Sequence, residues 1–163
     1  MRKRLIDAEQ KTTESRSNAA RDWIDLTAIA EVEISSEAEG YPIEQALRAE
    51  PAAGWRAATP GPQIIRLRFD APAEIKYIRL HFIERAADRS QEFAIYAGTT
   101  ESDLRQVVRQ QYSFSPGGST EEIEEYTVDL KHVTVLELRI DPDRAHDPKQ
   151  SQHYASLAGL RLA

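Results

Sequence analysis

The sequence of 163 residues contains no cysteine, which excludes disulfides, thiolate metal sites and a cysteine nucleophile. No apolar run approaches the ~18 residues that a membrane-spanning helix needs. The basic residues at positions 2–4 are not followed by the apolar segment of a signal peptide. We therefore expect a cytoplasmic protein with no membrane insertion.

Sequence motifs of common enzymes are missing as well. The chain has no Gly-x-Ser-x-Gly, no His-Glu-x-x-His, no Gly-rich phosphate loop and no paired histidines on one helix. We expect a non-enzymatic protein without a cofactor. A hydrolase stays open as a third hypothesis, because a catalytic triad assembles in space rather than in sequence. It would need a cluster of perturbed acid and base groups in one cleft.

Hydrophobic residues make up 40% of the chain and charged residues 29%, as in one soluble globular domain. The formal net charge of −6 is unevenly distributed. Residues 1–22 hold six basic and four acidic residues, which leaves 15 basic and 23 acidic residues, or −8, for residues 23–163. We expect a polar leader over 1–22, mobile or docked on a partner, and a globular body over 23–163. Nucleic acid is an unfavourable ligand for such an acidic body.

Apolar residues in the body recur with the period of two that is typical of β-strands. In residues 63–69, for example, Ile65, Leu67 and Phe69 share one face and the arginines lie on the other. The alternation predicts eight strands at residues 30–34, 63–69, 74–84, 91–97, 105–114, 120–130, 133–140 and 154–162. Ile123 is out of phase with Tyr126, which predicts a bulge near Glu124 and Glu125. Eight strands separated by turn signals favour an all-β fold, a jelly-roll β-sandwich.

Helix signals are few. Pro42 suits a first helical position and predicts one short internal helix over residues 42–48, the only one longer than a turn. A further single turn is expected at residues 101–104.

If consecutive strands reverse direction, every second connection lies at the same end of the sandwich. The links 35–62, 85–90, 115–119 and 141–153 then share one end, which we call the loop end. The links 70–73, 98–104 and 131–132 share the opposite end, the bend end. Long loops on a rigid sandwich are the usual place for binding, so we expect the ligand site at the loop end.

Several segments resemble the discoidin family, also called coagulation-factor type C domains, which has the galactose-binding-domain-like fold. They are Val32-Glu33-Ile34-Ser35-Ser36, Pro42-Ile43-Glu44-Gln45-Ala46-Leu47, Gly54-Trp55-Arg56-Ala57, Gln63-Ile64-Ile65-Arg66-Leu67 and the final stretch 155–162. Three of these segments are also similar to the N-terminal domain of the single-strand-break repair scaffold, a member of the same fold that binds a polymerase and nicked DNA.

The resemblance implies an eight-stranded jelly roll that binds glycans, lipid head groups or proteins through loops at one end. Many discoidin members have Asp-Gly after the short helix, in a region that helps to hold a structural calcium. This chain has Arg48-Ala49-Glu50 there, so we expect no bound calcium and no other metal.

Candidate ligand-binding residues lie on the links of the loop end. They are Tyr41, Trp55, Arg56, Arg85, Arg89, His146 and His153. An aromatic ring beside a guanidinium suits a sugar or a similar small polar ligand. For Trp55 the alternative is structural packing of its loop, and for Arg85 and Arg89 it is a solvated charge run.

The link 141–153 resembles a metal site by residue type, with Asp141, Asp143, His146, Asp147 and His153. No known ligand spacing matches, and the aspartates serve equally well as turn formers. Our leading hypothesis is a recognition domain that binds a carbohydrate or small polar ligand. The alternative is a protein-interaction domain that docks a partner by a sheet face or by the leader.

Overall fold

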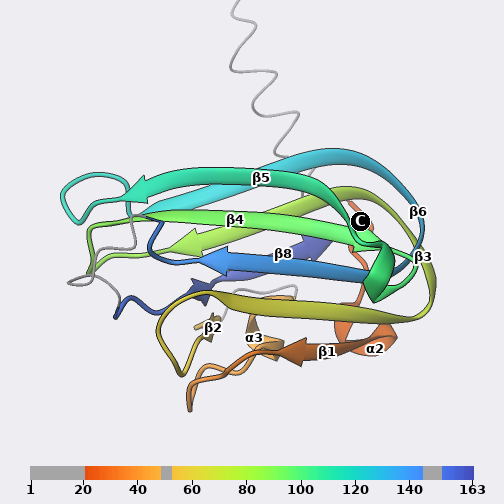
Figure 1. Ribbon diagram of the computed structural model, residues 1–163, viewed down its shortest axis with the longest axis horizontal. Coiled ribbons are helices and arrows are strands. Elements are labelled where there is room, and N and C mark those ends of the chain that lie inside the picture. Colours follow the sequence, from red (N-terminus) through yellow and green to blue (C-terminus); the bar gives the residue numbers. More distant parts are fainter. Residues whose placement is uncertain (1–20, 49–52, 145–151) are drawn as a thin grey trace, which may run out of the picture.

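The computed structural model describes residues 21–48, 53–144 and 152–163 and shows an all-β sandwich (Figure 1). The described strands are β1 (Ala30–Ile34), β2 (Trp55–Arg56), β3 (Gln63–Ile83), β4 (Arg89–Gly98), β5 (Arg105–Phe114), β6 (Glu121–Asp141), β7 (Ser156–Leu157) and β8 (Gly159–Leu162). The prediction of an eight-stranded jelly-roll β-sandwich is confirmed, although several strand boundaries differ.

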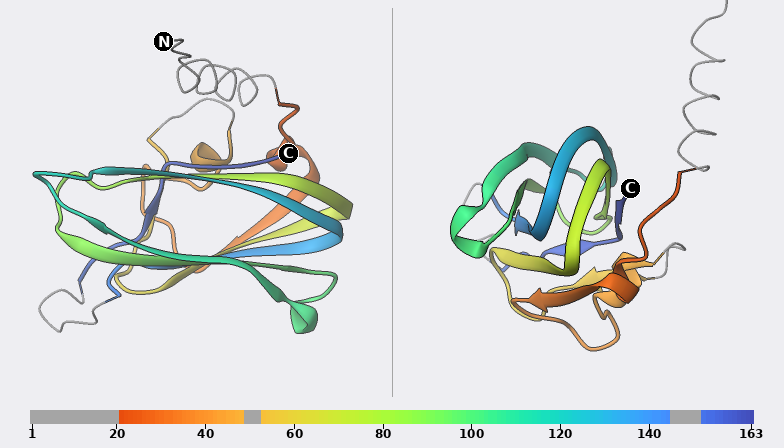
Figure 2. Two further views of the ribbon diagram at one scale, coloured as in Figure 1. Left: turned by 90° about the horizontal axis from the view of Figure 1, so that it is seen from above. Right: turned by 90° about the vertical axis from the view of Figure 1, so that its right-hand side faces the viewer.

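Two long strands, β3 and β6, bend and run through both layers of the sandwich. In the larger layer the strand order is β1-β3-β6-β4-β5, and in the smaller layer β8 pairs with the second half of β3, which pairs with the first half of β6. Ile65 opposes Leu138 in the larger layer, whereas Ile78 opposes Tyr126 in the smaller one. Figure 2 shows these two layers joined at one end by the curved strands.

The continuity of β3 and β6 corrects the predicted strand list. Residues 63–69 and 74–84 belong to one strand, as do residues 120–130 and 133–140. The ladder between β3 and β6 shifts register between Arg68 and Tyr77, and His132 has a φ of 55° at the bend. The bulge predicted near Glu124 is wrong, because the ladder is unbroken over the pairs that surround it.

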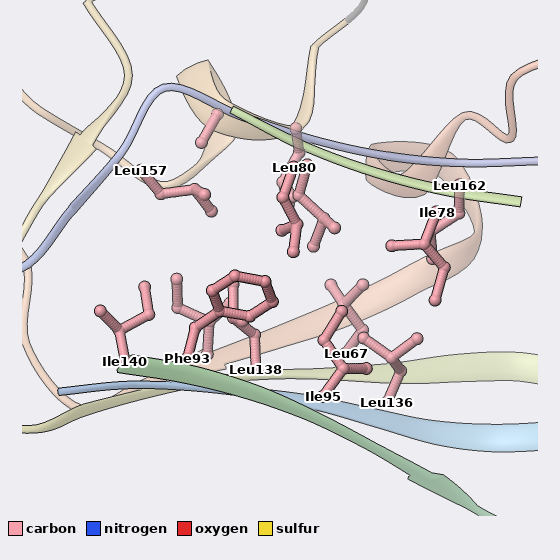
Figure 3. Close-up of a cluster of buried hydrophobic side chains, with 14 of the residues drawn as sticks. Leu67, Ile78, Leu80, Phe93, Ile95, Leu136, Leu138, Ile140, Leu157 and Leu162 are labelled. Atoms are coloured by element: carbon pink, nitrogen blue, oxygen red, sulfur yellow. The ribbon is translucent and has the colours of Figure 1, made fainter. Parts of the chain in front are cut away.

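Alternating apolar residues of both layers form the core between them, as the period of two predicts. Leu67 and Leu138 face inward from the larger layer, and Leu80 faces them from the smaller layer (Figure 3). All three are fully buried. Burial of each such side chain contributes roughly 1.5–3 kcal/mol, so the core fixes the two layers that carry the loops.

The helices are shorter than the sequence predicts. The helix expected over 42–48 is the single turn α3 (Glu44–Leu47), because Arg48 already has extended backbone angles. A second turn, α2 (Leu26–Ile29), was not predicted. The turn expected at 101–104 is confirmed as the 3₁₀ helix η1 (Glu101–Asp103).

The leader predicted over residues 1–22 lies, except for its last two residues, outside the described residues and stays a prediction. The body has begun at Trp23, whose ring centroid lies 5.6 Å from that of Tyr77. None of the helices in the described part is long and apolar enough to cross a membrane.

Candidate functional site

The described parts of the four predicted links meet at one end of the sandwich, so the predicted loop end is confirmed for these residues. Strand pairing places the end of β3 beside the start of β6, since Ile83 opposes Glu121, and the start of β3 beside the end of β6, since Gln63 opposes Ile140. It also places Arg89 at the start of β4 opposite Phe114 at the end of β5. The described residues of the links 35–62, 84–88, 115–120 and 142–155 therefore lie at the same end, the loop end.

Gln63, at the start of β3, holds the longest of these links in place. Its Oε1 accepts hydrogen bonds from the hydroxyls of Ser35 and Ser36 at 2.6 and 2.7 Å. Its Nε2 donates to the backbone oxygen of Thr59 over 3.1 Å. Because Gln63 is buried, these bonds fix both ends of the link relative to β3.

Trp55 is a structural residue rather than a ligand platform. Its side chain is 1% exposed, and its indole nitrogen donates to the carbonyl of Ser36 over 3.1 Å. Trp55 also pairs with Leu157 in the small β2–β7 ladder. The structural alternative therefore holds for Trp55, because the loop closes over the ring and leaves no face to a ligand.

Arg89 is also buried, which contradicts its assignment to the ligand site. Its side chain is 1% exposed. Nε donates to Glu84 over 2.9 Å, and Nη1 donates to Gln91 over 2.6 Å and to the carbonyl of Pro142 over 3.0 Å. Arg89 therefore ties three segments of the loop end together from inside.

Tyr41 and Arg56 remain at the surface and contact each other. The guanidinium carbon of Arg56 lies 4.6 Å from the ring centroid of Tyr41, a cation–π distance. The two residues also share a backbone hydrogen bond of 3.4 Å from Arg56 N to Tyr41 O. This pair presents a guanidinium and an aromatic edge to solvent.

His153 and Tyr154 lie beside this pair. The amide of Gly61 donates to the carbonyl of His153 over 3.1 Å, and the amide of Ala57 donates to the carbonyl of Ala155 over 2.9 Å. Tyr154, between them, is 46% exposed. We did not predict Tyr154 as a site residue, because the expected final strand begins with it. Its position next to His153, a predicted site residue, could have indicated it.

Arg85 lies on the same end and is exposed. Ser156, the register partner of Arg56, donates its hydroxyl to the carbonyl of Ile83 over 3.4 Å. Arg85 follows Ile83 by two residues, on the link that begins beside the β2–β7 ladder.

The metal-like set of the link 141–153 is only partly described. His146 and Asp147 lie outside the described residues. Asp141 accepts a hydrogen bond from the amide of Asp143 over 3.2 Å, which is the behaviour of a turn former. Within the described part of the chain, no group of three or more His, Asp or Glu side chains could hold a metal ion.

A second polar cluster covers the outer face of the larger layer. Glu137, whose side chain is 2% exposed, accepts hydrogen bonds from Arg66 at 2.6 Å and from Arg139 at 2.7 Å. The bond to Glu137 raises the pKa of Arg66. An adjoining hollow of about 210 Å³ is lined by Ile64 and Arg139 among others. The guanidinium and carboxylate groups of the cluster pair with one another, which favours a structural role for the cluster.

Comparison with known proteins identifies the family. The family model described as anaphase-promoting complex, subunit 10 (APC10), matches residues 3–141. The chain belongs to the APC10 family. No curated protein matches the sequence.

Solved structures similar to this APC10-family chain share its fold at low identity. The CBM32-1 and CBM32-2 domains of Clostridium perfringens ZmpB, in complex with GalNAc, match at a TM-score of 0.64 and 16% identity over 96% of this chain. This chain spans 39% of the length of that one. The family 32 module of C. perfringens NanJ, in complex with galactose, matches at 0.59 and 13% identity, over 86% of this chain and 96% of that one.

Reduced XRCC1 bound to the DNA polymerase β catalytic domain matches at a TM-score of 0.60 and 16% identity, over 83% of this chain and 96% of that one. These matches support the galactose-binding-like fold, including the similarity to the single-strand-break repair scaffold. The family that they accompany is the APC10 family, and the discoidin family stays a resemblance.

Proposed function

We propose that this APC10-family chain is a non-catalytic recognition domain that docks an exposed segment of a protein partner at the loop end. The observation that carries the proposal is the contact of the exposed Arg56 with the half-buried Tyr41, together with the exposed Tyr154 on the neighbouring link. Tyrosine and arginine are the residues that concentrate binding energy at protein interfaces. The family description, a subunit of a multiprotein complex, supports a protein partner as well.

The rigidity of this surface also suits docking. Hydrogen bonds from the buried side chains of Gln63 and Trp55 hold the described parts of the link 35–62, so Arg56 loses little conformational freedom on binding. Arg56 is already held over Tyr41 before any ligand arrives. A pre-organised surface of this kind favours recognition without a large conformational change.

Affinity capture with the tagged full chain, followed by titration calorimetry with the purified partner, tests the proposal. Arg56→Ala and Tyr154→Ala should weaken binding. The loss of one charge-assisted hydrogen bond corresponds to about 1.5–3 kcal/mol, or roughly 10- to 150-fold in Kd. Lys76→Ala, on β3 near the bend end, should bind as the unaltered chain does. Equal binding by all variants would overturn the loop-end site.

A second candidate function, binding of a carbohydrate or small polar ligand, is favoured by the same two residues. A sugar needs an aromatic face and forked donors, which Tyr41 and Arg56 supply. Arg56 lies over the Tyr41 ring, however, and Trp55 is buried, so less aromatic surface is free than the sequence suggests. Calorimetry with galactose and GalNAc, together with a glycan array, decides between the two candidates: sugar binding that Tyr41→Ala abolishes would favour this one. The expected cytoplasmic location is part of the proposal, and cell fractionation tests it.

A further inference from the structure

Among the described residues, four strand edges of the sandwich have no neighbouring strand: β1 and β5 in the larger layer, and β8 and the first half of β6 in the smaller one. In the larger layer, β5 pairs with β4 on one side only. In the smaller layer, residues 121–130 of β6 pair with β3 on one side only. Each free edge presents a row of backbone N–H and C=O groups that can pair with another strand.

The edges of β5 and of the first half of β6 lie on the same side of the molecule. In each layer β6 is the neighbour of β3. In the larger layer β4 lies on the far side of β6 from β3, and β5 lies next to β4 at the edge. The borders formed by β5 and by the first half of β6 therefore face the same way, and both strands run along the upper side of Figure 1. β5 runs toward the loop end and the first half of β6 runs away from it, so the two are antiparallel.

The charges of the two edges are complementary. Residues 105–114 contain two arginines and no acidic residue, whereas residues 121–130 contain four glutamates, one aspartate and no basic residue. Pairing of either edge with its own copy brings like charges together, which is unfavourable. Pairing of β5 with the acidic edge of another molecule brings opposite charges together.

We propose that the protein forms a twofold symmetric dimer in which β5 of each copy pairs with the first half of β6 of the other. A twofold axis parallel to the strands exchanges the two layers while it preserves strand direction. The axis therefore places β5 of each copy antiparallel to the first half of β6 of the other copy, and the same pairing occurs twice. The interface is isologous and closes at two molecules.

One register matches both faces of the paired strands. Arg109 lies on the outer face opposite Ala94 and contacts Glu92 and Tyr96 of its own copy. Glu125 lies on the outer face opposite Arg79 and forms an ion pair with it over 3.3 Å. Pairing of the two edges would join these two charge clusters. Gln110 and Glu124 lie on the inner faces, opposite Phe93 and Leu80. With Arg109 opposite Glu125 of the second copy, Gln110 therefore comes opposite Glu124 of the second copy. Charge and hydrogen-bonding groups are then matched on the two faces at once.

Light scattering coupled to size exclusion tests the dimer. We expect a mass of twice 18.4 kDa. Arg109→Glu and Glu125→Arg, made singly, should raise the dimer dissociation constant at least tenfold, and the two changes combined in one chain should restore it. Lys76→Glu, on an exposed side chain away from both edges, should leave the dimer intact. Circular dichroism shows whether each variant remains folded.

A monomer at all soluble concentrations would overturn the proposal, and so would a dimer that none of the edge variants affects. Cysteine pairing tests the register separately, because the natural chain has no cysteine. In this register Gln111 lies opposite Ile123 of the second copy, within the Cα distance of a disulfide. A mixture of Gln111→Cys and Ile123→Cys proteins should cross-link on oxidation. A mixture of Gln111→Cys and Ser102→Cys proteins should not; equal cross-linking of both mixtures would overturn the register.

Discussion

Arg89 donates from Nε to Oε1 of Glu84 over 2.9 Å, across the short link that joins β3 to β4. The same guanidinium lies 5.1 Å from the ring centroid of Phe114, at the end of β5. A buried guanidinium with this many partners contributes to the stability of the fold. We therefore expect substitutions of Arg89 to change stability rather than ligand affinity.

Replacement of Arg89 by alanine should therefore destabilise the fold. The change removes the donor to Oε1 of Glu84, to Gln91 and to the carbonyl of Pro142, and removal of one member of a buried ion pair costs about 3–5 kcal/mol. Urea unfolding followed by tryptophan fluorescence measures the loss. Arg85→Ala, on the same link but exposed, should change the free energy of unfolding by less than about 0.5 kcal/mol. If the two variants were equally stable, the framework role of Arg89 would be wrong.

Trp55→Ala should also lower stability, by roughly 3–5 kcal/mol, because a fully buried aromatic side chain is lost. Trp55→Phe should recover much of the packing while it still lacks the hydrogen bond to Ser36. Thermal unfolding of the two variants separates packing from hydrogen bonding. Unchanged stability of Trp55→Ala would contradict its structural role.

Gly54 precedes Trp55 and admits no side chain. Its φ is +76°, and a Cβ there would lie 2.6 Å from the carbonyl oxygen of Leu157 in β7. Gly40 provides a matched control, because its φ is +84° but nothing lies within 4 Å of the added atom. Gly40→Ala should cost only the left-handed backbone strain, about 1–2 kcal/mol. Gly54→Ala should lower the free energy of unfolding, measured with a chemical denaturant, clearly more than Gly40→Ala does. Equal losses in the two variants would show that β7 moves to make room for the added methyl group.

Stability should depend on pH through Glu122. Burial raises the pKa of Glu122 from its ordinary 4.5 to about 7, and the neighbouring Glu124 adds to the shift by a hydrogen bond and by its charge. The folded state then holds a proton that the unfolded state releases, so stability is fully present below pH 4.5 and falls as the pH rises from about 4.5 to 7.

Glu122→Gln should remove that decline between about pH 4.5 and 7, and should raise the melting temperature at pH 8 relative to the unaltered chain. Melting curves recorded across this range provide the measurement. Asp129→Asn, on the exposed face of the same strand, should keep the decline. A pH profile that Glu122→Gln leaves unchanged would contradict the assignment.

The sequence predicts the layers and the loop end well, because alternation and strand parity are local properties of the chain. It predicts two pairs of separate strands where β3 and β6 are continuous, since the Pro72 segment and the Lys131-His132 step look like turns yet are bends in paired strands. The burial of Trp55 and Arg89 depends on how distant links pack together. Glu137 was missed for a related reason: its arginine partner Arg66 is set by cross-strand register, which alternation alone does not determine.

The passage of β3 and β6 through both layers has a consequence for how the molecule opens. Because the same two strands supply hydrogen bonds to each layer, a rupture that starts in one layer removes the pairing partners of the other. Amide protons near Ile65 and near Ile78 should therefore exchange with one common opening free energy, that of global unfolding. The buried side chains of Trp55 and Gln63 anchor the link 35–62 to this unit. Exposed positions of the loop end, such as Arg56 and Arg85, can therefore change without loosening the strands beneath them.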